Sequence, residues 1–259
     1  MLERRSAQGN RMIGNVKTTF SVQDKFKEDK KVKKEFRDFS TIIGAVKQLE
    51  EYGKKFHYKR IMLENKEIAR RCVSSSIYRS FRNYPKNNSP SVIFRNWAEE
   101  NIEKLKLEIE KSNKQVDYDS IIKAYGKALI KDWKNKSNGK KIGYGPALKM
   151  LNLLIKKMHE GEKIDTKYEK YFNVPIDSYI LVPLAPIIDD LSNCLYSINI
   201  TKNATMGMIS CEEIYDQVQI VLRKIAEKAK ISPIIIDYYC WDEVSANGKK
   251  KKIGKEKDF

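Results

Sequence analysis

Apolar side chains recur at intervals of three and four residues along most of the chain. This spacing places them on one face of an α-helix, and it predicts helices within residues 39–52, 68–83, 90–107, 117–133 and 147–158. The stretch from Ile231 to Tyr239 fits either a strand or a helix. With only 12 glycines and 7 prolines, the chain has few residues for tight turns, which disfavours a β-sandwich or barrel. The pattern therefore predicts an all-α protein.

The net charge of the chain indicates the kind of partner that it would bind. Lys and Arg number 51 against 34 Asp and Glu, a formal net charge of +17. A surplus of this size attracts polyanions, and nucleic acid is the commonest of them. The alternative is a lysine-rich protein whose charge only keeps it in solution. Much of the surplus lies in runs, including Lys249 to Lys252 in the tail, where we expect only non-specific affinity.

Other features of the sequence exclude several classes of protein. The longest apolar stretch, Ile176 to Ile188, is broken by charged and proline residues, so we expect no membrane span. No apolar run follows the first arginines, and the absence of a secretory signal favours the cytoplasm. The four cysteines lack any C-x-x-C pair and there are only two histidines, so we expect free thiols and no metal or cofactor. The cysteines are Cys72, Cys194, Cys211 and Cys240.

A glycine-rich break between two predicted helices is the first candidate binding site. Gly143-Tyr144-Gly145 precedes Pro146, where we expect the second helix to begin. We expect the glycines to take positive φ and to leave backbone N–H groups free for a phosphate, with Lys140 and Lys141 adding charge. The same residues would also serve as an ordinary loop between two helices.

A second candidate lies at a predicted helix entrance. Asp177 follows Pro175 and Ile176, and its side chain is well placed to cap the helix that starts with Ser178 and Tyr179. Capping alone would account for the aspartate.

Together these motifs resemble the helix–hairpin–helix DNA glycosylase superfamily. The family pattern is a G-x-G hairpin, a helix with K-x-x-N and a [VI]-D-[ST]-x-[VI] element. It corresponds here to Gly143–Gly145, Lys149–Asn152 and Ile176–Ile180. The order agrees, but Lys149 lies two residues farther from the hairpin than is usual, and Ala147 holds the usual lysine position. The resemblance is closest to the 8-oxoguanine glycosylase branches, where a polar residue and an aromatic residue four apart hold the base, as Asp237 and Trp241 would here.

The resemblance implies a reaction and a role for each residue. The enzyme would flip a damaged or modified base, guanine-derived as a first guess, out of double-stranded DNA and excise it. Asp177 would stabilise the positive charge on the sugar, and Lys149 would attack the sugar as a neutral amine in an AP-lyase step. If Lys149 does not reach the sugar, Asp177 would orient a water instead. Asp237 and Trp241 would form the base pocket, and the protein would act as a monomer at the nucleoid.

On this interpretation the chain divides into four parts. Residues 1–20 are a disordered lead-in, residues 21–115 an N-terminal helical part, residues 116–246 the helix–hairpin–helix catalytic part, and residues 247–259 a basic tail. Two alternatives remain: a non-catalytic helix–hairpin–helix DNA-binding protein, and a helical interaction protein with no DNA role.

Overall fold

The computed structural model describes residues 41–73, 89–188, 200 and 204–241, and these residues contain helices and no strand. The prediction of an all-α protein is confirmed for this part of the chain. The proposed lead-in and basic tail, and the predicted helix beyond residue 73, lie outside it. The α-helices are α2 (Ile42–Lys55), α3 (Asn65–Arg71), α4 (Pro90–Glu110), α5 (Gln115–Lys136), α6 (Tyr144–Glu160), α7 (Ser178–Ile188) and α8 (Glu212–Lys228). Two 3-10 helices, η4 (Thr166–Tyr171) and η6 (Met206–Met208), and a helical segment at 234–241 complete it.

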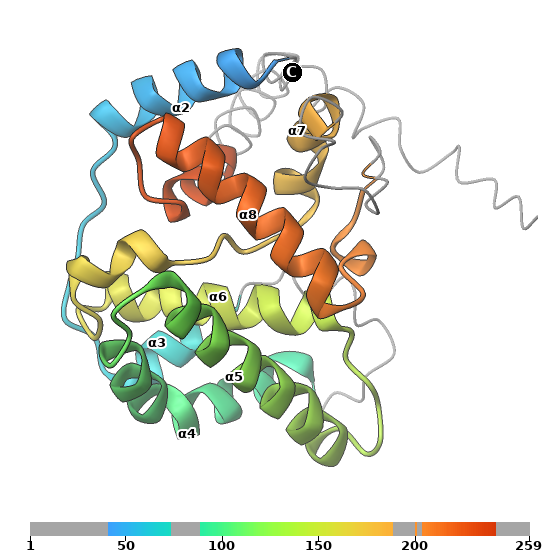
Figure 1. The fold of residues 1–259 in the computed structure, drawn as a ribbon. Coiled ribbons are helices and arrows are strands. Elements are labelled where there is room, and N and C mark those ends of the chain that lie inside the picture. The colour runs from blue at the N-terminus through green and yellow to red at the C-terminus, as the bar shows by residue number, and fades with distance from the viewer. Residues whose placement is uncertain (1–40, 74–88, 189–199, 201–203, 242–259) are drawn as a thin grey trace, which may run out of the picture.

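Helix α6 runs through the middle of the molecule (Figure 1). Helices α3, α4 and α5 lie on one side of it, and α2, α7 and α8 lie on the other. Helix α6 packs directly against α3, α4, α5 and η6. Twelve of its residues are buried, and eight of these are apolar or glycine, as is typical of a helix in a protein interior.

Helix boundaries follow local sequence signals. Pro90 opens α4 directly after Ser89, as the sequence predicted, because proline fits the first turn of a helix without losing a hydrogen bond. Thr41 caps α2 by accepting a hydrogen bond from the Gly44 backbone N–H. The predicted helix at 117–133 is α5, and the ambiguous stretch near Ile231 is helical from residue 234 onward.

The described helices share one apolar core. This core contains residues from both sides of position 115, where the sequence analysis divided the chain. Trp97 of α4, Tyr118 and Trp133 of α5 and Tyr215 of α8 are all fully buried in it. Among the described residues, no helix is both long enough and apolar enough to cross a membrane.

The segment between α2 and α3 lies along the C-terminal end of α6. Ile61 donates its backbone N–H to the Glu160 carbonyl over 3.0 Å, and Leu63 donates to Gly161 over 3.2 Å. The Arg60 guanidinium adds hydrogen bonds to the His159 and Ile164 carbonyls, over 3.0 and 2.8 Å. These bonds hold the segment against the helix that carries the candidate site.

Candidate active site

A stripe of polar side chains runs along one buried face of α6. It consists of Lys149, Asn152, Lys156 and His159, which we call the polar stripe. At about 100° per residue, the spacings of three, seven and ten residues keep all four within about 80° around the helix axis. Each member is buried, with at most 8 % of the whole residue exposed. Buried polar groups are costly unless they are paired, so their partners define the site.

The first member of the polar stripe forms a buried ion pair with Asp177. Lys149 Nζ lies 2.8 Å from Asp177 Oδ2, and each side chain is only 7 % exposed. The two residues are 28 positions apart in the sequence, and the fold brings the entrance of α7 to Lys149. The structure thus unites the two residues that the sequence singled out for catalysis.

Asp177 also caps α7, as the sequence predicted. Its Oδ1 accepts hydrogen bonds from the backbone N–H groups of Tyr179 and Ile180, over 2.8 and 3.3 Å. One oxygen therefore fixes the carboxyl group at the helix entrance while the other faces the Lys149 ammonium. The capping and catalytic roles are compatible in this geometry because they use different oxygens.

A second buried ion pair joins Lys156 to Asp237. Lys156 Nζ lies 2.6 Å from Asp237 Oδ2, and the side chains are 9 % and 1 % exposed. Asp237 Oδ1 is buried and has no hydrogen-bond partner among the described residues. Burial raises the pKa of Asp237, the Lys156 ammonium opposes that rise, and Asp177 and Lys149 lie close enough to act on the same group. The predicted base-pocket carboxylate thus adjoins the predicted catalytic pair.

Trp241 completes the cluster at the end of the described C-terminal segment. The Lys149 ammonium lies 5.9 Å from the centre of its ring, and the ring packs edge-on against Tyr179 at a centroid distance of 5.0 Å. All four residues predicted for catalysis and base binding therefore lie in one place. The Lys149–Asp177 pair is buried, whereas Trp241 is partly exposed.

The other two members of the polar stripe have structural partners. Asn152 donates to the Tyr215 hydroxyl over 2.7 Å, which ties α6 to α8. His159 donates from Nδ1 to the Ile164 carbonyl over 3.2 Å, because a carbonyl oxygen can only accept. The Tyr58 hydroxyl contacts His159 and donates to Glu169 over 2.7 Å. His159 Nε2 lies 3.2 Å from Glu169 Oε2. Burial opposes ionisation of Glu169, but the hydrogen bonds from His159 and Tyr58 outweigh it and lower the pKa of Glu169.

The glycine-rich turn differs from its predicted geometry. Helix α6 begins at Tyr144 rather than Pro146, and Gly143 is its N-cap, with an ordinary φ of −73°. The positive φ values lie earlier in the turn, at Asn138 and Gly139. The Gly145 N–H is not free for a phosphate, because it donates to the Ile209 carbonyl over 2.8 Å. The expectation that the glycines take positive φ is therefore wrong, and so is the expectation of an open N–H group at Gly145.

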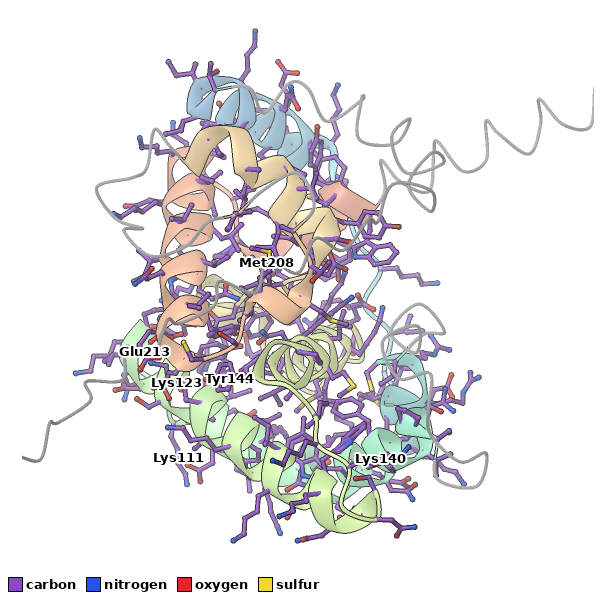
Figure 2. All side chains as sticks on the ribbon, turned by 90° about the vertical axis from the view of Figure 1, so that its right-hand side faces the viewer. Lys111, Lys123, Lys140, Tyr144, Met208 and Glu213 are labelled. Carbon is purple, nitrogen blue, oxygen red and sulfur yellow. The ribbon has the colours of Figure 1, made fainter. Side chains whose placement is uncertain are left out.

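The exposed part of the turn remains a candidate DNA contact. Gly143 and Lys141 are exposed, and Lys140 is partly exposed. Figure 2 looks nearly along α6 and shows Tyr144 and Met208 near its N-terminal end, with Lys140 lower in the picture, on the turn that precedes the helix. Helix η6 packs on this end of α6, next to the turn.

A cavity elsewhere in the described structure does not coincide with the cluster of predicted site residues. It has a volume of about 550 Å³ and is lined by residues that include Gln115, Lys170, Arg223 and Lys230. None of the predicted site residues lines it. Within the described ranges, no group of three or more His, Cys, Asp or Glu side chains is placed to hold a metal ion.

Comparison with known proteins does not extend the argument. No family model, no curated protein and no solved structure matches the chain. The assignment of the site therefore depends on its residues and geometry.

Sequence reasoning missed the partners that build the site. It did not identify Lys156 as the partner of Asp237, and it did not consider Tyr179 or Tyr238 as site residues. The available signal was the continuation of the K-x-x-N spacing to Lys156 and His159, since polar residues at these spacings on an otherwise apolar helix require buried partners.

Proposed function

We propose that the protein is a DNA glycosylase that excises a damaged or modified base from double-stranded DNA, with an AP-lyase step carried by Lys149. The observation that carries the proposal is the buried Lys149–Asp177 ion pair, with Asp237 and Trp241 beside it. Excision of an extruded base by this route requires four groups: an amine, a carboxylate, a hydrogen-bond acceptor for the base and an aromatic face.

Each group has a role in the proposed reaction. The C1′–N bond breaks with its electron pair on the base, and a bond forms between C1′ and Lys149 Nζ. Asp177 Oδ2, 2.8 Å from Nζ, accepts a proton from the ammonium so that the amine can attack. One amine proton is transferred to the departing base overall. This is the proton that Asp177 took from the ammonium, so Asp177 is again a carboxylate as positive charge develops on the sugar. It stabilises that charge strongly because water is excluded.

The base pocket is formed by the second ion pair and Trp241. Asp237 Oδ1, which has no partner among the described residues, accepts from an N–H group on the edge of the base. Such an edge fits a guanine-derived base. Trp241 provides the stacking face, worth about 1–3 kcal/mol per base.

The net charge of the chain and the exposed turn before α6 support DNA as the partner. The net charge is +17, and the exposed turn at Lys141 and Gly143 leads directly into the helix that carries Lys149. Contact with a phosphate at this turn fixes the DNA backbone at one end of the polar stripe. The protein then works as a monomer on nucleoid DNA in the cytoplasm.

The direct experiment incubates the protein with duplexes that carry a panel of oxidised, alkylated and modified bases, followed by alkali. Strand cleavage at one lesion, absent with Asp177→Asn, supports the proposal. Intact strands across the panel would oppose it.

Non-catalytic DNA binding is the second candidate, favoured by the closure of the Lys149–Asp177 pair at 7 % exposure. In that case the pair only joins α6 to α7. Asp177→Asn distinguishes the two functions, because an enzyme variant loses turnover and keeps its affinity for duplex DNA. An electrophoretic mobility shift measures the affinity.

A further inference from the structure

The ring of Tyr238 lies against the ammonium of the second ion pair. Lys156 Nζ is 3.5 Å from the ring centroid while it is 2.6 Å from Asp237 Oδ2. Asp237 and Tyr238 are neighbours in the chain, so the ammonium contacts two consecutive residues of the helical segment 234–241. The face of an aromatic ring attracts a cation, most strongly where water is excluded.

The position of the Tyr238 ring is fixed from two further directions. It stacks on Tyr58 with a centroid distance of 5.5 Å and an interplanar angle of 8°, and it packs against Phe56 at 4.7 Å. Its hydroxyl donates to the Glu160 carboxylate. Burial, with the nearby Glu160 charge, raises the pKa of Tyr238, so the phenol stays neutral at physiological pH. The ring is therefore a neutral surface held in one orientation.

We propose that Tyr238 is a positioning residue: its ring face holds the Lys156 ammonium on Asp237 Oδ2 and so leaves Asp237 Oδ1 as an ionised acceptor for a ring N–H of the extruded base. The inference depends on the proposed glycosylase function for its meaning. It adds the substrate class: bases whose pairing edge carries a ring N–H, as opposed to a bare ring nitrogen.

The physical reason lies in the cost of a buried carboxylate. Asp237 is 1 % exposed, and a carboxylate without a paired cation at such a site takes up a proton. A protonated Asp237 would donate a hydrogen bond and would then prefer a bare ring nitrogen. The charged groups that act on Asp237 are Lys156 and Lys149 of α6 and Asp177 before α7. Lys156 is the one in direct contact, and of these groups it opposes the effect of burial on Asp237 most strongly.

The experiment measures the protonation midpoint of Asp237 by 13C NMR of its side-chain carboxyl, assigned by comparison with Asp237→Asn. Tyr238→Leu removes the ring, and Tyr238→Phe keeps the ring but loses the hydroxyl. Tyr239→Leu is the matched control, because Tyr239 lies on the same segment and its hydroxyl donates to Gln48 of α2. If Tyr238→Leu does not fold, Tyr238→Met replaces it, since methionine fills irregular gaps.

We expect the Asp237 midpoint to rise by about one pH unit or more in Tyr238→Leu or Tyr238→Met. It should stay near the wild-type value in Tyr238→Phe and Tyr239→Leu. An unchanged midpoint in both Tyr238→Leu and Tyr238→Met would overturn the inference. An equal shift in Tyr238→Phe would overturn it too, because the hydroxyl rather than the ring face would then be responsible.

Enzyme kinetics provide a readout that depends on the proposed function. The pH dependence of kcat/KM is measured on a base that the wild type excises. The acid limb of this profile should shift to higher pH in Tyr238→Leu, together with the NMR midpoint, and should not shift in Tyr238→Phe. An unmoved limb contradicts the positioning role. If the wild type excises no base in the panel, the proposed function fails, and the NMR titration still decides whether Tyr238 holds Lys156 on Asp237.

Discussion

The backbone N–H of Gly145 donates to the carbonyl oxygen of Ile209 over 2.8 Å, so the segment after α7 is bound to the first turn of α6. A Cβ atom at Gly145 would lie 2.1 Å from the Met206 carbonyl oxygen and 3.0 Å from the Ile209 side chain. Gly145 is thus required for a close approach of two backbones, one turn before Lys149 on the same face of α6.

Gly145→Ala should therefore destabilise the fold. We expect a loss of about 1–3 kcal/mol, because the added methyl group meets backbone rather than a movable side chain. Thermal unfolding followed by circular dichroism should show this as a lower Tm. Gly143→Ala is the matched control, since its nearest neighbour would be Pro146 Cδ at 3.5 Å. Equal Tm values for the two variants would contradict the packing role of Gly145.

Gly143 gives the cleaner test of DNA contact. It is exposed and occupies the N-cap of α6 with an extended backbone, where Asp and Asn both fit well. Gly143→Asp should weaken duplex binding about fivefold at low salt, since two unit charges about 4 Å apart interact by about 1 kcal/mol in water.

Gly143→Asn is the control for that substitution, because it has the same shape without the charge. Fluorescence anisotropy with a labelled duplex measures both variants at several salt concentrations. The difference between them should vanish as salt rises. Identical binding by the two variants in low salt would remove this turn from the DNA interface.

The helical pattern predicted most of the described fold because each apolar face had a partner to bury it. Helices α4 and α5 begin close to their predicted positions, where Ser89-Pro90 and Asp117 provide local signals. The turn before α6 was predicted less well. Its backbone is set by the tertiary bond from Gly145 to Ile209, and no local pattern reports a partner that lies 64 residues along the chain.

In the candidate site too, the sequence predicted the short-range contact but not the one between residues far apart in the chain. The cap formed by Asp177 is a short-range feature, so the sequence was enough to predict it. The pairing of Lys156 with Asp237 joins residues 81 positions apart. The sequence offered many lysines, and only the packing of segment 234–241 on α6 selects this one.

The network around Glu169 makes a prediction about acid stability. The pKa of Glu169 lies below its ordinary value of 4.5, so its contribution to stability is present above that pH and is lost as the pH falls through the folded-state pKa. Glu169→Gln should lower the free energy of unfolding at pH 7 by about 1–3 kcal/mol, because the hydrogen bonds from Tyr58 and His159 lose a charged acceptor.

Urea unfolding of wild type and Glu169→Gln from pH 7 to pH 3 measures this contribution. The difference between the two proteins should shrink below about pH 4.5, where the unfolded-state carboxyl becomes protonated. Glu162→Gln, an exposed residue near the same turn, should show no such difference. A difference for Glu169→Gln that stays constant with pH would mean that its charge is not involved.

Removal of the Asp177 charge should separate chemistry from binding. Asp177→Asn keeps a side-chain oxygen for the α7 cap but leaves the buried Lys149 ammonium without its carboxylate. We expect excision to fall at least about 100-fold, as for the loss of one electrostatic stabiliser in other enzymes. Duplex affinity should change little. Single-turnover excision and an electrophoretic mobility shift measure the two effects, with circular dichroism to verify folding.

Borohydride trapping is the most direct test of the central claim that Lys149 attacks the sugar of an emptied or substrate nucleotide. The protein is incubated with a substrate duplex and sodium borohydride, and covalent complexes are resolved on a denaturing gel. We predict a trapped complex for the wild type and for Lys157→Gln, whose lysine lies on the same helix but pairs with Glu160. We predict no complex for Lys149→Gln. A trapped complex of equal yield in Lys149→Gln would contradict the account.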